Sequence, residues 1–296
     1  CNPNKSCARE MFTPYSPPMP DWLQVVLLGV IEGITEFLPI SSTGHLLLWR
    51  EWIALPKGWS PKFFETFVIF IQSGAVLAVI TVFRERVGGL IGNWRKKEPQ
   101  EYLKKLLFSF TLTGIGGLAL KENGWELPNE STPIAWALLI GGALFIAFEL
   151  HNRKKKQEEE IKISSITWTI AIAFGMAQLI AMVFPGASRS GTTILIGLVL
   201  GMGHREAVEY SFLLGVPTLL AAGGYELALA LKEDAATVQA EWQMLLLGAL
   251  VSSVTAFLAV KWLLGYLQKN SFTAFGWYRI AIGIAVLILS GRIVTG

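Results

Sequence analysis

The segment PISSTG at residues 39–44 interrupts an apolar run that extends over residues 22–55. A second apolar run, at residues 166–203, is interrupted in the same way by PGASRSG at residues 185–191. A broken backbone at membrane depth is tolerated only where protein or a watery cavity satisfies its polar groups. We therefore expect each run to form a re-entrant hairpin whose break lines a site inside a membrane protein.

The composition places the rest of the chain in lipid. Of its 296 residues, 52% are hydrophobic and only 16% are charged, and the mean hydropathy is +0.49. This is too apolar for an ordinary soluble domain. The small net charge of +3 has no clustered basic face, which argues against nucleic-acid binding. Because the two cysteines, Cys1 and Cys7, both lie in the polar N-terminal stretch, no cysteine metal site is expected in the membrane body.

Six further apolar stretches are long enough to cross the hydrocarbon without a break, for which a helix needs about 20 residues. They cover residues 63–83, 104–120, 133–150, 207–231, 244–264 and 277–293. The loops at residues 84–105 and 151–162 are basic, whereas residues 121–132 and 232–241 are mainly acidic. The positive-inside rule then makes the basic loops cytoplasmic and the acidic ones external. This alternation holds only if each hairpin enters and leaves on one side.

The two interrupted runs also share a spaced pattern, G-x-x-[E/Q]-x6-P-x-x-S. Its positions are Gly29, Glu32, Pro39 and Ser42 in the first copy and Gly175, Gln178, Pro185 and Ser188 in the second. Three spans follow each copy, so the second copy must enter from the opposite face. We predict an all-α, polytopic membrane protein with six transmembrane helices and two re-entrant helical hairpins in an inverted-topology repeat.

The predicted organisation along the chain has four parts. A polar, flexible tail without an apolar run occupies residues 1–20, and the first repeat occupies residues 21–150. A charged cytoplasmic loop at residues 151–165 then leads to the second repeat at residues 166–296.

Two carboxylates lie in the first hairpin. Glu32 and Glu36 are four residues apart, which places them on one face of a helix, roughly 6 Å from each other. Ionised carboxylates at membrane depth are costly unless they are paired or metal-bound. They could pair with Arg50 or Arg189, or carry protons. As a functional pair, they suit Mg²⁺ or Ca²⁺, which prefer oxygen ligands.

Hydroxyls and an imidazole follow the first break. A helix that begins near Pro39 would bring His45 close to Ser42, which is the minimum for an activated nucleophile. The alternative is that Ser42 only caps the helix and His45 only packs. Ser41 and Thr43 flank Ser42 and are further candidates for substrate binding.

The second break carries an arginine, Arg189, at the start of a half-helix. The exposed N–H groups and positive dipole of a helix start favour an anion, and a guanidinium binds phosphate oxygens with two donors. The alternative is an internal salt bridge to Glu32 or Glu36. The neighbouring candidates for phosphate binding are Ser188, Ser190, Gly191, Thr192 and Thr193. Together the two breaks predict phosphoryl chemistry on an amphiphile.

At these residues the sequence resembles the bacterial undecaprenyl-diphosphate phosphatase family, which is associated with bacitracin resistance. The matching text is GVIEGITEFLPISSTGHLLL at residues 29–48 and PGASRSGTT at residues 185–193. FIQSGAVLAV at residues 70–79 and SFLLGVP at residues 211–217 support it. The likeness covers residue 21 to the C-terminus.

The resemblance implies hydrolysis of a polyprenyl diphosphate to the monophosphate, which recycles the carrier lipid for peptidoglycan. It implies a divalent cation and a site that opens to the outer face of the bacterial cytoplasmic (inner) membrane. The matching positions are Glu32 and Glu36 for the acidic motif, Ser41, Ser42 and His45 for the Ser/His motif, and Ser188, Arg189, Ser190 and Thr193 for the arginine motif. The expected partners are the lipid, the bilayer and a second copy of the chain in a homodimer, with no nucleic acid.

Two other classes fit parts of the pattern. Inverted repeats with broken helices are typical of transporters, so a lipid flippase is the main alternative. An ion channel fits less well because one arginine and two glutamates form no repeated selectivity ring. Within the phosphatase hypothesis, the attacking group is Ser42, His45 or a metal-bound water.

Overall fold

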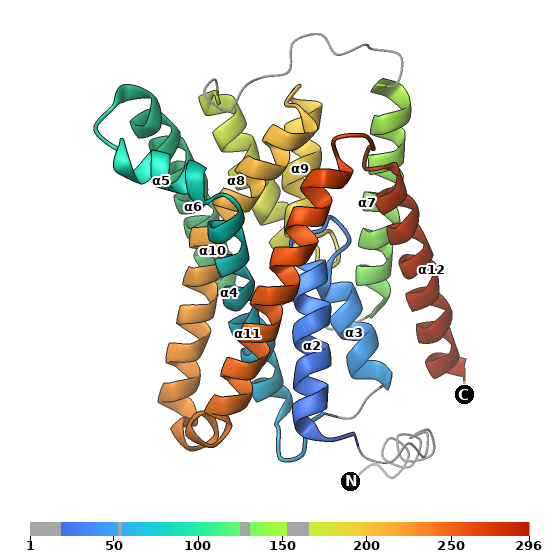
Figure 1. The fold of residues 1–296 in the computed structure, drawn as a ribbon. Coiled ribbons are helices and arrows are strands. Elements are labelled where there is room, and N and C mark those ends of the chain that lie inside the picture. The colour runs from blue at the N-terminus through green and yellow to red at the C-terminus, as the bar shows by residue number, and fades with distance from the viewer. Residues whose placement is uncertain (1–18, 53–54, 125–130, 153–165, 296) are drawn as a thin grey trace.

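The computed structural model describes residues 19–52, 55–124, 131–152 and 166–295, and this part of the chain is helical without strands (Figure 1). Two pairs of short helices correspond to the interrupted runs. They are α2 (Asp21–Thr35) with α3 (Ser42–Trp52), and α8 (Trp168–Val183) with α9 (Arg189–Val199). The longer helices are α4 (Pro61–Val82), α6 (Lys97–Glu122), α7 (Ser131–Asn152), α10 (His204–Glu233), α11 (Ala235–Tyr266) and α12 (Thr273–Thr295). A short helix, α5 (Arg84–Gly92), connects α4 to α6.

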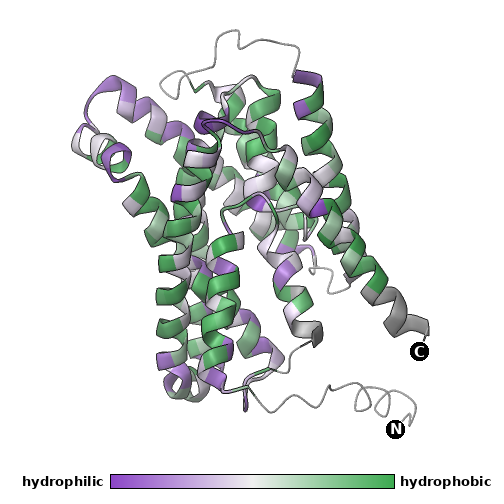
Figure 2. Cartoon of the chain, turned by 45° about the vertical axis from the view of Figure 1, so that its right-hand side comes forward, coloured by the Kyte–Doolittle hydropathy of each residue, from purple (hydrophilic) through white to green (hydrophobic). Residues whose placement is uncertain are grey.

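The long helices have the length and surface of membrane spans. Five of them, α4, α6, α7, α10 and α11, are long and apolar enough to cross a bilayer, and α12 has 23 residues. Large apolar side chains such as Leu77, Ile140 and Leu250 are more than half exposed. Figure 2 shows apolar residues along these helices and hydrophilic residues gathered near the two ends. Since soluble proteins rarely expose so much apolar surface, this surface faces lipid, and the chain is a multi-pass membrane protein.

The two short pairs enter the bundle from opposite ends. The α2–α3 pair starts and finishes at the end that holds the α10–α11 junction, whereas α8–α9 starts and finishes at the end that holds α5 (Figure 1). Both breaks lie in the middle of the bundle. The predicted all-α fold with two oppositely oriented re-entrant hairpins is confirmed. The predicted tail and charged loop fall mostly on residues 1–18 and 153–165, outside the described residues, so the domain boundaries stay a prediction.

The α10–α11 junction differs from the predicted acidic loop at residues 232–241. Only Asp234 separates the two helices, and its carboxylate accepts hydrogen bonds from the amide and hydroxyl of Thr237 at 3.1 and 2.6 Å. These bonds lower the pKa of the Asp234 carboxyl and satisfy the start of α11. Most of the predicted loop is therefore helix.

Each hairpin packs against a long helix from the other half of the chain. Helix α2 contacts α11, and α8 contacts α6. Thr255 on α11 donates to the Gly29 carbonyl at 3.3 Å, and Thr113 on α6 donates to the Gly175 carbonyl at 3.2 Å. A Cβ at Gly29 would lie 2.9 Å from a carbonyl oxygen of α11, so only glycine allows this approach. The halves are interlocked, which fixes both breaks at the centre of the bundle.

Candidate active site

The helices that follow the two breaks, α3 and α9, start in the same way. Ser41 and Ser188 both have φ 70°, a conformation that residues with a Cβ rarely adopt. Each serine hydroxyl accepts a hydrogen bond from the amide three residues later, Gly44 at 3.4 Å and Gly191 at 3.1 Å. Ser41 is thus the counterpart of Ser188. The predicted correspondence between Ser42 and Ser188 is wrong by one residue, because the cap follows Pro39 after two residues and Pro185 after three.

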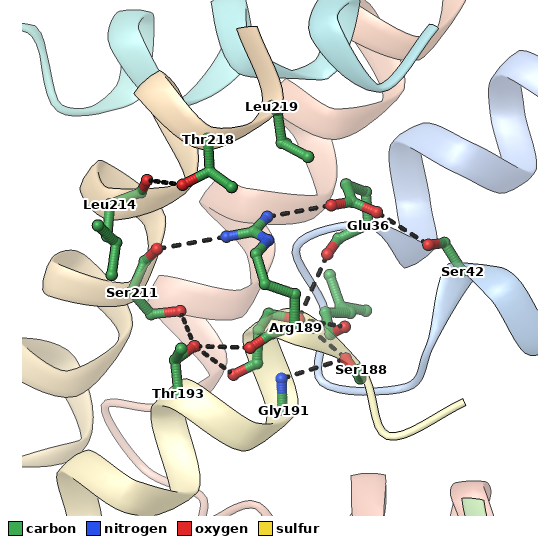
Figure 3. Close-up of polar contacts among 12 residues, drawn as sticks. Glu36, Ser42, Ser188, Arg189, Gly191, Thr193, Ser211, Leu214, Thr218 and Leu219 are labelled. Atoms are coloured by element: carbon green, nitrogen blue, oxygen red, sulfur yellow. Dashed lines mark hydrogen bonds and ion pairs between the residues drawn. The ribbon is translucent and has the colours of Figure 1, made fainter. Parts of the chain in front are cut away.

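The first helical residues after these caps, Ser42 and Arg189, converge on one carboxylate (Figure 3). The hydroxyl of Ser42 donates to Oε2 of Glu36 at 2.8 Å. Nη2 of Arg189 donates to Oε1 of the same carboxylate at 3.0 Å. The side chains of Arg189 and Glu36 are only 13% and 7% exposed. The predicted salt bridge and the predicted hydroxyl candidate therefore belong to one buried cluster.

The neighbouring residues fix the orientation of the Arg189 guanidinium. Nη1 donates to the Ser211 carbonyl at 3.3 Å (Figure 3). The guanidinium also lies 5.4 Å from the ring centroid of Phe37. A Cβ at Gly215 on α10 would overlap Nη1, so glycine is needed there to admit the side chain. Nε has no hydrogen-bond partner among the described groups. Arg189 thus keeps an unused donor in a buried site, as a phosphate-binding group requires.

The other hydroxyls of the second break have partners within the protein. Ser190 donates to the Leu38 carbonyl at 3.1 Å and so ties the second break to the first. Thr193 donates to the Arg189 carbonyl at 2.7 Å, and Thr192 donates to the Ser188 carbonyl at 3.0 Å. These hydroxyls hold the framework, and the Gly191 amide is used by the cap. Their contact with phosphate stays a prediction, as does that of Thr43, which is exposed.

His45 is not placed beside Ser42. Its Nδ1 lies 2.8 Å from the Ser41 carbonyl, which can only accept, so Nδ1 carries a proton. Its Nε2 lies 2.8 Å from the hydroxyl of Tyr278, and the two rings stack. The predicted contact between His45 and Ser42 is not among the hydrogen bonds of the described residues. The base within reach of Ser42 is Glu36.

Glu32 lies one helical turn before Glu36 on α2. Its side chain is fully buried, and neither carboxylate oxygen has a hydrogen-bond partner among the described groups. A buried carboxylate without partners requires a cation or a proton. No group of three or more acidic, histidine or cysteine residues in the described part of the chain is arranged to hold a metal ion. Two carboxylates fit a cation such as Mg²⁺, which takes its other ligands from water and substrate phosphate.

Two residues of α12, Tyr278 and Arg279, contact the breaks and were missed by the sequence analysis. Tyr278 holds His45, and Arg279 reaches main-chain carbonyls of both breaks. The available signal was Arg279 itself, because an ionisable residue inside an apolar stretch such as residues 277–293 is a candidate for function.

Comparison with known proteins identifies similar chains. The profile of the family described as "Bacitracin resistance protein BacA" matches residues 25–285. An "Undecaprenyl-diphosphatase" of Rhizobium etli (strain CIAT 652) is 46% identical over 268 residues, which cover 90% of this chain and 96% of that protein. A protein of the same name from Xanthomonas oryzae pv. oryzae (strain PXO99A) is 41% identical over 271 residues, covering 91% of this chain and 97% of that protein.

Proposed function

The chain belongs to the bacitracin resistance protein BacA family, and we infer from this premise that it hydrolyses undecaprenyl diphosphate to the monophosphate and inorganic phosphate. The observation that carries the inference is the buried cluster of Ser42, Glu36 and Arg189. It combines a hydroxyl, a carboxylate that can accept its proton, and a guanidinium that binds phosphate oxygens. Release of the monophosphate returns the carrier lipid to cell-wall synthesis and accounts for resistance to bacitracin.

In the first step, the Ser42 oxygen attacks the terminal phosphorus and its proton passes to Glu36. The bond from that phosphorus to the bridging oxygen breaks, and undecaprenyl phosphate leaves with the electron pair and receives the proton from Glu36. Arg189 stabilises the charge that gathers on the terminal oxygens. The hydrogen bond of 2.8 Å between Ser42 and Glu36 is already suited to this proton transfer.

In the second step, water attacks the phosphoserine and gives a proton to Glu36. The bond between phosphorus and the Ser42 oxygen breaks, inorganic phosphate leaves, and Glu36 returns the proton to Ser42. Glu36 therefore acts as base and acid in turn, and the chain ends in its starting state. His45 is less suited to attack, because its Nε2 already contacts the hydroxyl of Tyr278.

A divalent cation, Mg²⁺ or Ca²⁺, completes the proposal. Glu32 and Glu36 would hold it, and it would neutralise charge on the diphosphate. The unpaired oxygens of Glu32 support this assignment.

We place the protein in the bacterial cytoplasmic membrane with the α10–α11 junction outside and the α5–α6 connection inside. Basic residues near α5 and the acidic junction support this orientation. In a variant that lacks Cys1 and Cys7, single cysteines at Asp234 and Lys96 can be labelled in intact cells by an impermeant reagent. Labelling is expected at Asp234, and preferential labelling at Lys96 would overturn the orientation. Homodimer formation is part of the proposal and is tested by the particle mass in detergent.

Phosphate release tests the activity directly. The purified protein in detergent, supplied with Mg²⁺ or Ca²⁺, should release phosphate from undecaprenyl or farnesyl diphosphate, and Ser42→Ala should not. No release with any divalent cation would refute the proposed function.

A further inference from the structure

Arg279 lies wholly buried in α12, at the depth where the two breaks meet. No ion pair with Arg279 occurs among the residues that the structure describes. A charged group at this depth is costly unless its donors are satisfied. Its partners are main-chain carbonyls, which are fixed by the fold, so the guanidinium serves as a multiple hydrogen-bond donor to the backbone.

The guanidinium contacts both breaks. Nη1 donates to the Pro39 carbonyl at 3.3 Å, and Nη2 lies within reach of the Gly186 and Ala187 carbonyls at 3.2 and 3.0 Å. Residues in a break have no helical partner for their carbonyls, so these are groups that need a donor at membrane depth. One side chain thus satisfies the carbonyls of two segments almost 150 residues apart in the sequence.

The same guanidinium is anchored to α7. Nη2 and Nε lie 3.2 and 3.5 Å from the Ala137 and Leu138 carbonyls. A Cβ at Gly142 would lie 2.6 Å from the Gly276 carbonyl, and one at Gly276 would lie 2.9 Å from the Gly142 carbonyl. These two glycines allow α7 and α12 to pack closely, so the backbone that carries Arg279 is held firmly against α7.

The contacts of Arg279 lie next to the reacting groups in the sequence. Pro39 is three residues before Ser42, and Ala187 is two residues before Arg189. Through these main-chain contacts, Arg279 therefore sets the spacing between Ser42 and Arg189. This effect is independent of the carboxylate that both of them contact.

We infer that Arg279 is a positioning residue for phosphoryl transfer, which aligns the attacking hydroxyl of Ser42 with the phosphate-binding Arg189 by tying both breaks to one guanidinium. The inference rests on the proposed function of that cluster. Arg279 acts through the backbone and needs no contact with substrate. Lysine cannot replace it fully, because an ammonium offers fewer donors and no planar fork.

The test compares Arg279→Met and Arg279→Lys with the wild-type protein in detergent. A displacement of about 1 Å in a reacting group can lower the rate by about 100-fold, and we expect this loss in kcat for Arg279→Met with KM little changed. Arg279→Lys should recover part of kcat. Hydrogen exchange should accelerate at the amides of residues 38–44 and 185–191 in both variants, and less in the lysine variant.

The control is Phe145→Leu. Phe145 is buried on α7 and occupies the position that matches Arg279 when Gly142 is aligned with Gly276. This variant perturbs the packing of α7 on Phe272, directly before α12, and removes no hydrogen bond to the breaks, so it should lower the unfolding temperature and leave kcat and exchange in the breaks unchanged.

Normal kcat in folded Arg279→Met would overturn the inference, as would equal losses in both variants without faster exchange in the breaks. If Arg279→Met does not fold, Arg279→Lys decides: wild-type kcat overturns the inference, and a lower kcat at constant KM with faster exchange supports it. Absence of phosphate release by the wild-type protein would instead refute the proposed function, and the exchange data would still show whether Arg279 fixes the breaks.

Discussion

The hairpins α2–α3 and α8–α9 share one framework and carry different chemistry. In both, a serine with φ 70° caps the second helix, and a threonine from the opposite half binds a glycine carbonyl of the first helix. The residue directly after the cap is Ser42 in one hairpin and Arg189 in the other. The same backbone geometry in the two hairpins thus places a hydroxyl and a guanidinium against one carboxylate, that of Glu36.

The two hairpins also differ in the first helix, at the positions of Glu32 and Gln178. Gln178, the counterpart of Glu32, donates from Nε2 to the Thr113 hydroxyl at 3.0 Å, whereas the carboxylate of Glu32 has no hydrogen-bond partner among the described groups. Both side chains are buried. The second hairpin has a neutral amide, of which Nε2 is hydrogen-bonded and Oε1 has no partner among the described groups, where the first has a carboxylate. Because only a carboxylate carries a charge that needs a partner, cation binding is expected in the first hairpin only.

The largest expected difference between the two hairpins concerns the attacking group, Ser42. Ser42→Ala should abolish turnover because no other hydroxyl in the described structure is hydrogen-bonded to the Glu36 carboxylate, whereas Ser41→Ala removes only a cap bond and should retain most turnover. Phosphate release by the two purified variants is the measurement. His45→Ala should leave slow activity.

The opposite result identifies a different nucleophile. If Ser42→Ala retains more activity than His45→Ala, and mass spectrometry after a quench without acid finds phosphate on His45, Ser42 does not attack.

Arg189 tests the other member of the pair. Arg189→Lys keeps the charge but loses the planar pair of donors, and removal of one transition-state donor typically costs about 10² to 10³ in rate. We expect a loss of kcat in this range. Arg205→Lys, at an exposed position near the start of α10, is the matched control and should have normal kcat. Near-normal turnover by Arg189→Lys would remove Arg189 from the site.

Much of this site could be predicted from the sequence. Proline and glycine inside apolar runs mark the breaks, and the cost of burying Glu36 and Arg189 in lipid predicts that they meet. Their ion pair at 3.0 Å agrees with this reasoning.

The remainder depends on tertiary contacts that spacing does not encode. Counting from Pro39 and Pro185 assumes that the cap follows each proline at the same distance, but the cap is two residues after Pro39 and three residues after Pro185. Helical periodicity places His45 near Ser42, but the hydroxyl that it contacts belongs to Tyr278, 233 residues away. Arg279 is one charge in an apolar span, and only the packing of α12 on α7 shows which carbonyls it reaches.

Substitution of Glu32 tests the second difference between the hairpins, which is cation binding. Even outer partners of metal ligands contribute roughly 10- to 100-fold in affinity, so Glu32→Gln should raise the Mg²⁺ or Ca²⁺ concentration for half-maximal activity by at least this much. Gln178→Ala, at the matching position, should leave the requirement unchanged. Titration of activity against each cation is the measurement, and an unchanged requirement in Glu32→Gln would exclude Glu32 as a ligand.

The smallest expected effect concerns the strained caps themselves. Ser188 combines φ 70° with a bond from the Gly191 amide, whereas Ser60, which caps α4 with a bond from the Phe63 amide, has φ −78°. Replacement by alanine loses the cap bond at either site, and glycine is better tolerated than alanine as a cap. Only at Ser188 does glycine also relieve a left-handed backbone, worth about 1 kcal/mol. At each site, the stability difference is the free energy of unfolding of the glycine variant minus that of the alanine variant. This difference should be about 1 kcal/mol larger at Ser188 than at Ser60. Denaturation of the four variants in detergent measures both differences, and equal differences would mean that the shared cap geometry stores no strain.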